Sequence, residues 1–259
     1  MHFVVKGFLH NYRDLMTKPN LDVPILMYHR IGDRVKNSIV RDQYVPLDLF
    51  ESQLATLRKA GYTTISLDEM RAGFQSGNPL GLKGLVITFD DGYESFFNLA
   101  LPVLKRHGMK ATVFLVANCV GHTNRWDEAK GDVTEPLMSW DQIRSAHADG
   151  TEFGAHSMNH PDLRFCDDDT AAEEVAGCKG AIEKQLGFTV NWYSYPYGKH
   201  LERDRRLAKE AGYFGATGTD KQTNNANTDP FCLGRLNVRA TTFPAYLMYK
   251  LRKASGSHG

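Results

Sequence analysis

Two short segments of the sequence place metal-binding or proton-transferring side chains at close spacing. The first, TFDDG at 88–92, ends an apolar run with two adjacent carboxylates, Asp90 and Asp91, followed by a glycine. Consecutive side chains at the end of a strand diverge, so one carboxylate can bind a metal ion while its neighbour faces a substrate. The alternative is that the pair only caps a helix beginning near Glu94, where negative charge is favourable.

The second segment, GAHSMNHP at 154–161, carries two histidines four residues apart, His156 and His160. Two imidazoles at this spacing can converge on one ion, and neutral imidazole suits zinc and related divalent metals. Together with Asp91 they would supply two nitrogens and one oxygen, which leaves coordination positions for water and substrate. That ligand set is typical of a catalytic metal site rather than of a closed structural one.

A third segment, WYSYPYG at 192–198, is an aromatic run followed by a turn that contains proline and glycine. Standing alone, it indicates only a strand and a turn. Beside a metal site, the turn could offer a backbone N–H to a developing oxyanion, and the aromatic faces could stack on a sugar ring.

These segments are expected to lie at the ends of strands in an α/β fold. Short β-rich runs alternate with helical ones, and such alternation builds a parallel sheet because each crossover helix buries one face of it. With about seven units we expect a (β/α) barrel with its site at the carboxyl ends of the strands, and a doubly wound open sheet is the alternative. The expected strands are 25–28, 63–66, 85–89, 112–116, 152–155, 192–195 and 214–217, and the expected helices are 47–60, 67–76, 94–107, 139–149, 169–186 and 201–211.

Composition excludes several classes of protein. The formal net charge of +1 over 259 residues gives no electrostatic reason to expect nucleic acid as a partner. No apolar run approaches the roughly 18 residues of a transmembrane span. The four cysteines are scattered, so we expect free thiols rather than a zinc knuckle or a disulfide scaffold.

The chain is expected to hold one catalytic domain, 24–245, between two terminal segments. Residues 1–23 are interpreted as an N-terminal helical extension, because their apolar residues recur at helical spacing, and 246–259 as a C-terminal tail. The start of the chain lacks the long apolar region and cleavage site of a signal peptide, which predicts a cytoplasmic protein. Nothing in the sequence indicates an oligomeric state.

The three motifs together resemble those of the polysaccharide deacetylases, carbohydrate esterase family four, also called the NodB-homology family. TFDDG at 88–92, HSMNHP at 156–161 and YPYG at 195–198 are similar to the first three motifs of that family and come in the expected order. The resemblance extends to PILMYHRIG at 24–32 and MSWDQI at 138–143, and so covers nearly the whole chain. The YHRI start is similar to the branch that includes the poly-N-acetylglucosamine deacetylases.

The resemblance implies a distorted (β/α) barrel and a hydrolase that acts on an acetylated glycan. It also implies one divalent metal, most often Zn²⁺, with Co²⁺, Mn²⁺ or Ni²⁺ as alternatives. Asp91, His156 and His160 match the metal ligands of the family. Asp90 matches its general base, and the N–H of Tyr197 would stabilise the oxyanion together with the metal.

Two departures from the family pattern concern groups that assist the base and the leaving group. Many members tether the base with an arginine just before the P-Y-G turn, where this chain has Ser194. Arg235 could replace it if its strand reaches Asp90; a solvent-facing arginine is the alternative. Many members also carry a histidine general acid in a late motif, whereas here the only late histidine is His258. His29 is therefore the expected general acid, and orienting a carboxylate is its alternative role.

Four aromatic residues are expected to line the substrate cleft. Trp126 lies in a long loop, Tyr93 follows the metal aspartate, and Tyr195 and Tyr197 belong to the third motif. For Trp126 and Tyr93 the alternative is burial under neighbouring structure.

The expected function is hydrolysis of the N-acetyl group of N-acetylhexosamine units in a polysaccharide or glycan precursor. An O-acetyl glycan esterase is one alternative, because an ester has the better leaving group and needs a general acid less. A non-catalytic carbohydrate-binding relative is the other.

Overall fold

The computed structural model describes residues 22–40, 42–77 and 83–255. Nearly all of the expected N-terminal helical extension, 1–23, therefore lies outside the described residues, as do residues 256–259 of the expected tail.

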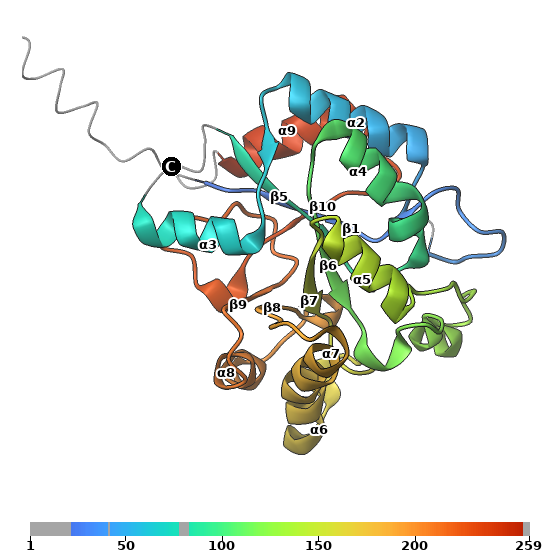
Figure 1. Ribbon diagram of the computed structural model, residues 1–259, viewed down its shortest axis with the longest axis vertical. Coiled ribbons are helices and arrows are strands. Elements are labelled where there is room, and N and C mark those ends of the chain that lie inside the picture. The colour runs from blue at the N-terminus through green and yellow to red at the C-terminus, as the bar shows by residue number, and fades with distance from the viewer. Residues whose placement is uncertain (1–21, 41, 78–82, 256–259) are drawn as a thin grey trace, which may run out of the picture.

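The strands form one parallel sheet that curls into a distorted barrel, as predicted (Figure 1). Neighbouring strands follow the order β10-β1-β5-β6-β7-β8-β9, and β4 pairs with the first residues of β5. All seven predicted strands are present within two residues of their predicted bounds; β10 and the small parallel pair β2–β3 were not predicted. The strands are β1 (Ile25–Tyr28), β2 (Arg30–Ile31), β3 (Tyr44–Val45), β4 (Thr63–Thr64), β5 (Gly84–Phe89), β6 (Thr112–Leu115), β7 (Glu152–Ala155), β8 (Trp192–Ser194), β9 (Gly215–Thr217) and β10 (Leu236–Asn237).

The two edges of this sheet are joined by one short segment, 233–237, here called the seam. Leu233 accepts a hydrogen bond from the backbone N–H of Gly218, just beyond β9, at 2.8 Å. Three residues later, Leu236 pairs in parallel with Leu26 of β1. A strand of two residues is too short to pair along the full length of both neighbouring strands, so the barrel is irregular at the seam.

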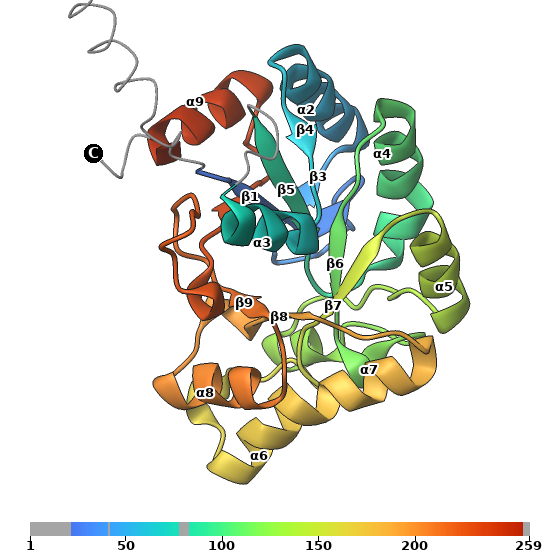
Figure 2. The ribbon, with the colours of Figure 1, turned by 60° about the vertical axis from the view of Figure 1, so that its left-hand side comes forward.

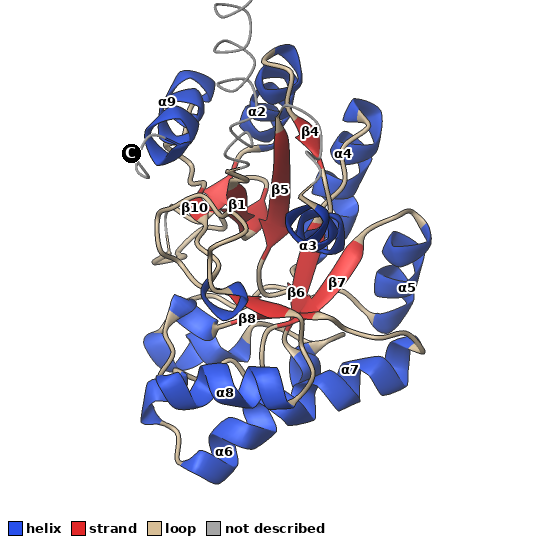
Figure 3. Cartoon of the chain, turned by 90° about the vertical axis from the view of Figure 1, so that its left-hand side faces the viewer, coloured by secondary structure: helices blue, strands red, loops and turns tan. Residues whose placement is uncertain are grey.

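Helices cover the outer face of the sheet (Figures 2 and 3). The six predicted helices are present, and two of them contain a π-helical turn, η1 (Phe96–Ala100) before α4 and η5 (Glu173–Gly177) between α6 and α7. In the described ranges no helix is long and apolar enough to cross a membrane. The helices are α2 (Leu47–Lys59), α3 (Leu67–Ser76), α4 (Leu101–His107), α5 (Trp140–Ala148), α6 (Asp168–Ala172), α7 (Cys178–Leu186), α8 (Glu202–Glu210) and α9 (Pro244–Ser255).

The prediction of a tail at 246–259 is wrong for the residues that the structure describes. Helix α9 continues to Ser255 and packs beside α2 (Figure 2). Its residues Leu247, Leu251 and Ala254 are buried, at the spacing of one face of a helix. The helical spacing of these apolar residues can be recognised in the sequence. The domain boundary at 245 was wrong because it was placed where the resemblance to the family motifs ends.

The packing explains the continuous apolar runs of the central strands. Every residue of β1, β5 and β6 is buried, because both faces of the sheet are covered. All four cysteines are free thiols, as expected.

Candidate metal and catalytic site

The three residues predicted as metal ligands converge at the carboxyl ends of β5 and β7. Asp91 Oδ1 lies 3.3 Å from Nε2 of His156 and 3.3 Å from Nε2 of His160. All three side chains are buried, and their potential ligand atoms lie within 4.8 Å of one another. The structure thus brings together one oxygen and two nitrogens from segments about 65 residues apart in the chain.

The chemistry of this group fits a divalent metal ion. His156 donates its Nδ1 hydrogen to the carbonyl of Ser194 at 2.7 Å, which leaves the lone pair on Nε2, toward Asp91. Asp91 Oδ1 is buried and accepts no well-aligned hydrogen bond, although buried polar atoms normally have a partner. A charged carboxylate and an imidazole lone pair that face each other are an appropriate ligand set for a cation.

The backbone is strained where these side chains converge. In the described ranges five non-glycine residues have positive φ, and four belong to the three motifs: Asp91 at 75°, Ser157 at 68°, His160 at 64° and Tyr197 at 58°. Such conformations cost about 1–3 kcal/mol each and tend to cluster at functional sites. The left-handed conformation turns each of these side chains away from the direction that a continued strand would give it.

Glycine follows two of the strained residues for a steric reason. Gly92 and Gly198 also have left-handed backbones, at φ 78° and 67°. A Cβ at Gly92 would lie 2.9 Å from the side chain of Leu115, and one at Gly198 would lie 2.3 Å from that of Thr219. The D-G and Y-G pairs are therefore requirements of two tight turns.

Asp90 points into the barrel and meets Arg235 from the seam. Arg235 donates from Nη1 to Oδ1 of Asp90 at 2.7 Å and from Nη2 to Oδ2 at 2.8 Å. The predicted contact is present, and the alternative of a solvent-facing arginine is wrong because Arg235 is only 1% exposed. Burial raises the pKa of Asp90, but the charges of Arg235 and His156 outweigh it, so that the pKa lies below its ordinary value.

The guanidinium of Arg235 uses all five of its N–H donors. Besides the two bonds to Asp90, it donates from Nη1 to Oγ1 of Thr88 at 3.2 Å, from Nη2 to Oγ of Ser194 at 3.0 Å and from Nε to the carbonyl of Gly218 at 2.9 Å. Ser194, which stands where many family members have arginine, thus contacts the arginine that reaches the base from elsewhere.

The catalytic groups open onto one cavity of about 840 Å³. His29 follows β1, lines this cavity and has a buried Nδ1 without a hydrogen-bond partner. It therefore opens onto the same face as the metal group, as expected. The cavity lining also includes Asp90, Asp91, His156, His160, Trp126 and Tyr197.

Trp126 and Tyr197 are placed as expected for sugar-binding residues. The ring of Trp126 stacks on that of His160, with centroids 4.6 Å apart and planes at 22°. Tyr197 meets the same imidazole edge-on and is 41% exposed. The two aromatic rings thus flank one histidine of the candidate metal group on the cavity wall.

The predictions for Tyr93 and Tyr195 as substrate-binding residues are wrong. Tyr195 is fully buried and donates its hydroxyl hydrogen to the carbonyl of Phe231 at 3.2 Å. Side chains alternate along a strand, so Tyr195 points away from the barrel interior that Ser194 faces. Tyr93 is 1% exposed and lies under the guanidinium of Arg30, 4.2 Å from its ring centroid, which is the burial considered as its alternative.

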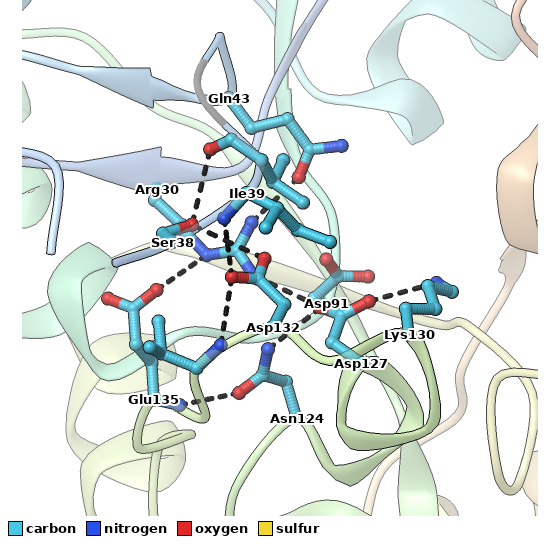
Figure 4. A network of polar contacts seen from close by, with 12 residues as sticks. Arg30, Ser38, Ile39, Gln43, Asp91, Asn124, Asp127, Lys130, Asp132 and Glu135 are labelled. Carbon is cyan, nitrogen blue, oxygen red and sulfur yellow. Dashed lines mark hydrogen bonds and ion pairs between the residues drawn. The ribbon is translucent and has the colours of Figure 1, made fainter. Parts of the chain in front are cut away.

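A polar network in the loop after β6 was not predicted (Figure 4). Asp127 accepts hydrogen bonds from Nη2 of the buried Arg30 at 3.2 Å, from Nδ2 of Asn124 at 2.8 Å and from Nζ of Lys130 at 2.9 Å. Lys130 also donates to the hydroxyl of Tyr197 at 3.0 Å. The network fixes the aromatic wall of the cavity from a distant part of the chain, which no local sequence pattern could indicate.

Glu174 is a second residue that the sequence did not reveal. It lies in the π-helical turn η5, is 5% exposed, and accepts hydrogen bonds from the backbone N–H groups of Met158 and Asn159 at 2.8 and 2.9 Å. It also accepts one from the side-chain amide of Asn159 at 2.7 Å. One carboxylate thus holds the strained loop between the two histidines of the candidate metal group.

We therefore expect Glu174→Ala to weaken metal binding without removing a ligand. Outer-shell partners of metal ligands typically contribute about 10–100-fold to affinity, so the Kd for zinc should rise by that factor. Calorimetric titration of zinc into chelated protein measures it. Glu173→Ala, an exposed neighbour in the same π-helical turn, is the matched control. Equal zinc affinity in the two folded variants would show that Glu174 does not position the histidines.

Comparison with known proteins agrees with this geometry. The family model described as polysaccharide deacetylase matches residues 77–216, just over half of the chain. YxkH of Bacillus subtilis, whose name places it among the polysaccharide deacetylases, is 28% identical over 90% of this chain and 78% of its own length. The poly-beta-1,6-N-acetyl-D-glucosamine N-deacetylase of Escherichia coli is 29% identical over 52% of this chain, a match that spans 20% of that protein.

Solved structures share the fold over most of the chain. A polysaccharide deacetylase from Bacillus cereus superposes with a TM-score of 0.75 at 25% identity, covering 89% of this chain and 69% of that one. A Streptococcus pyogenes deacetylase gives 0.76 at 24% identity, covering 89% and 98%, and likewise has the same fold. With the matched family model and the converged motifs, these similarities lead to one conclusion: the chain belongs to the polysaccharide deacetylase family, whose members are carbohydrate deacetylases.

Proposed function

We propose that this protein hydrolyses the N-acetyl group of N-acetylhexosamine units in a glycan and requires a divalent metal at Asp91, His156 and His160. The observation that carries the proposal is the pairing of two carboxylates with opposite environments. Asp90 is held by Arg235, while Asp91 faces two imidazoles. Of the metals that suit such ligands, zinc is the first to test, before cobalt, manganese and nickel.

The chain itself supplies a base in a fixed orientation. A divalent metal at this site would polarise the acetyl carbonyl and lower the pKa of water. Asp90 is charged at neutral pH, because Arg235 keeps its pKa low, and it lines the cavity beside the metal group. It takes the proton of the attacking water, and both of its oxygens are held by the guanidinium during the transfer.

Two further residues act on the other side of the acetyl group in this proposal. Tyr197 presents its backbone from a left-handed turn at the cavity, where its N–H stabilises the oxyanion. His29 donates a proton to the leaving amine, since no late histidine lies in the described part of the chain. The water oxygen bonds to the acetyl carbon as Asp90 takes the proton, and the C–N bond breaks as His29 protonates the nitrogen, which gives acetate and the free amine.

The substrate class is supported by the cavity wall and by the relatives. The half-buried Trp126 and the exposed Tyr197 offer aromatic surface on the cavity wall beside the metal group, as sugar-binding sites do. Curated relatives include proteins named for N-deacetylation of poly-N-acetylglucosamine, peptidoglycan and chitin. An O-acetyl ester remains a second candidate, because the described part of the chain has no histidine in the late position that many family members use and an ester needs a general acid less.

We expect acetate release to depend on the metal and on the type of acetyl group. Chelated protein should release no acetate, and added zinc, cobalt, manganese or nickel should restore release from N-acetylated oligosaccharides. Matched O- and N-acetylated oligosaccharides separate esterase from amidase. Calorimetry with Asp91→Asn, which should no longer bind zinc, reports the site independently of activity. Undiminished turnover after chelation would contradict the metal mechanism, and metal and sugar binding without any acetate release would indicate a non-catalytic relative.

We expect Arg235→Met to lower kcat and to move the pH profile. Without the guanidinium, burial raises the pKa of Asp90, so the acidic limb of kcat/KM should shift to higher pH. The loss in kcat should be about 100-fold, within the range that a positioned base contributes. Breaking a buried ion pair costs about 3–5 kcal/mol. Because Arg235→Met could therefore destabilise the fold, Arg235→Lys is measured beside it. Lysine keeps the positive charge, so the acidic limb of kcat/KM should shift less. Arg252→Met, on the exposed face of α9, is the control; an identical pH profile in all three would refute the role of Arg235.

We expect His29→Gln to slow amide hydrolysis selectively. An amine cannot leave without a proton, whereas the phenolate of 4-nitrophenyl acetate can, so kcat should fall about 10²-fold or more for the amide and little for the activated ester. His122→Gln, an exposed histidine outside the cavity, is the control. Equal losses on the two substrates would instead favour the alternative in which His29 orients a carboxylate.

A further inference from the structure

The cavity that holds the catalytic groups extends well beyond them. It runs past β1 and the seam to helix α9, and its far end is here called the α9 arm. None of the residues of the arm belongs to the three motifs. The arm consists of Lys221, Arg239, Tyr246, Tyr249, Lys250 and Lys253.

Helix α9 presents one face to this arm and buries the adjacent face. Tyr246, Tyr249, Lys250 and Lys253 recur at intervals of three, one and three residues, which places them along one face of a helix. The buried face of the same helix packs beside α2. The side chains of the arm are therefore held in place by the core packing of α9.

The charge of the arm is opposite to that of the catalytic end. The carboxylates that line the cavity, Asp90, Asp91 and Asp127, all lie at the metal end, whereas the arm has four cationic side chains and no carboxylate. The full chain has a net charge of only +1, so the cations are gathered here rather than in general excess. Arg239 forms an ion pair with Asp42, which lies outside the cavity lining.

The four cations line the same end of one cavity, and one of them is partly held. Lys250 donates from Nζ to the carbonyl of Asn237 at 2.7 Å. Burial lowers the pKa of Lys250, and the neighbouring charges of Arg239 and Lys221 lower it further. A cluster of like charges in a cleft favours an anion between them.

The aromatic residues of the arm give it a second recognition surface. Tyr246 and Tyr249 are 47% and 54% exposed, and their rings are nearly parallel, with centroids 6.0 Å apart and planes at 15°. The Nζ atom of Lys250 lies 5.0 Å from the ring centroid of Tyr246. Exposed tyrosine faces beside cationic groups suit a ligand that is partly apolar and partly anionic, such as a charged sugar.

We propose that the α9 arm binds an anionic group, a carboxylate or a phosphate, on a sugar unit near the N-acetylhexosamine whose acetyl group is removed. The substrate is then an anionic N-acetylated glycan rather than a neutral homopolymer. This inference rests on the proposed function, because it assigns the arm to the same glycan. The metal end binds the acetyl group, and the arm selects the chain that carries it.

Binding of three oligosaccharide probes of equal length tests the proposal. They are a neutral chitooligosaccharide, a hyaluronan oligosaccharide with carboxylates and a phosphodiester-linked N-acetylglucosamine oligomer. Calorimetry on the zinc-loaded protein at low salt should show at least about tenfold tighter binding of one or both anionic probes, and this preference should decline as salt screens the charges. Which anionic probe binds more tightly identifies the source of the charge.

Variants of the arm decide whether it causes the preference. Lys221→Glu and Tyr249→Ala alter exposed side chains of the arm, while Lys184→Glu makes the same charge change on the exposed side of α7. Lys221→Glu should abolish the anionic preference and leave binding of the neutral probe unchanged. Tyr249→Ala should weaken all probes that reach the arm. Lys184→Glu should behave as the unaltered protein.

Two results would overturn the proposal. One is equal affinity for neutral and anionic probes, or an anionic preference that survives Lys221→Glu. The other is equally tight binding of polyglutamate of the same charge, because the arm would then attract any polyanion. Calorimetry does not require turnover, so a protein that releases no acetate but keeps the lysine-dependent preference would refute the proposed function and support the arm.

Discussion

Inside the carboxyl end of the barrel a carboxylate and a guanidinium, Asp90 and Arg235, lie buried together. Removing each charge from water costs several kcal/mol, and the attraction between the two charges alone does not exceed this cost. The buried pair is favourable only when the remaining donors and acceptors also form hydrogen bonds. Here all five N–H groups of the guanidinium have acceptors. This requirement explains polar residues inside an otherwise apolar barrel, because Thr88 on β5 and Ser194 on β8 both accept from Arg235. One ion pair therefore joins two strands to the seam and fixes the direction in which the base points.

With Asp90 directed inward, its neighbour has to leave the strand in another direction. Asp91 does so through a left-handed backbone, and Gly92 continues the turn where a side chain would collide with the next strand. The histidine loop has the same problem, since His160 is also left-handed. Strained conformations persist only where surrounding contacts outweigh them. For the loop, those contacts include the hydrogen bonds that Glu174 accepts from its backbone and those that its carbonyls accept from Ala117 and Asn118, so the π-helical turn supports the metal group.

The parts of this structure that could be predicted from sequence are those with a local signature. Buried strands show as apolar runs, and the metal group shows as carboxylates and histidines at the ends of such runs. Tyr195 was misplaced because a strand end does not reveal which face its alternating side chains take. The sequence left two alternatives for Arg235, contact with Asp90 or exposure to solvent. It could not decide between them, because the two residues are 145 positions apart in the chain. Glu174 and the two-residue strand β10 carry no local pattern at all, because tertiary packing alone gives them their roles.

The irregular seam connects the catalytic end of the cavity to its far end. A regular barrel would have a full-length strand and its helix at this position against β1. Here the two residues of β10 pair with β1, and the residue before them, Arg235, enters the interior. The chain then passes directly to α9, which packs beside α2 along the same cavity. Carboxylates at one end and cations at the other give this cavity an electrostatic direction. A ligand with an acetylated unit and a separate negative charge would therefore be favoured in one orientation, and that orientation is set by the same closure that positions the base.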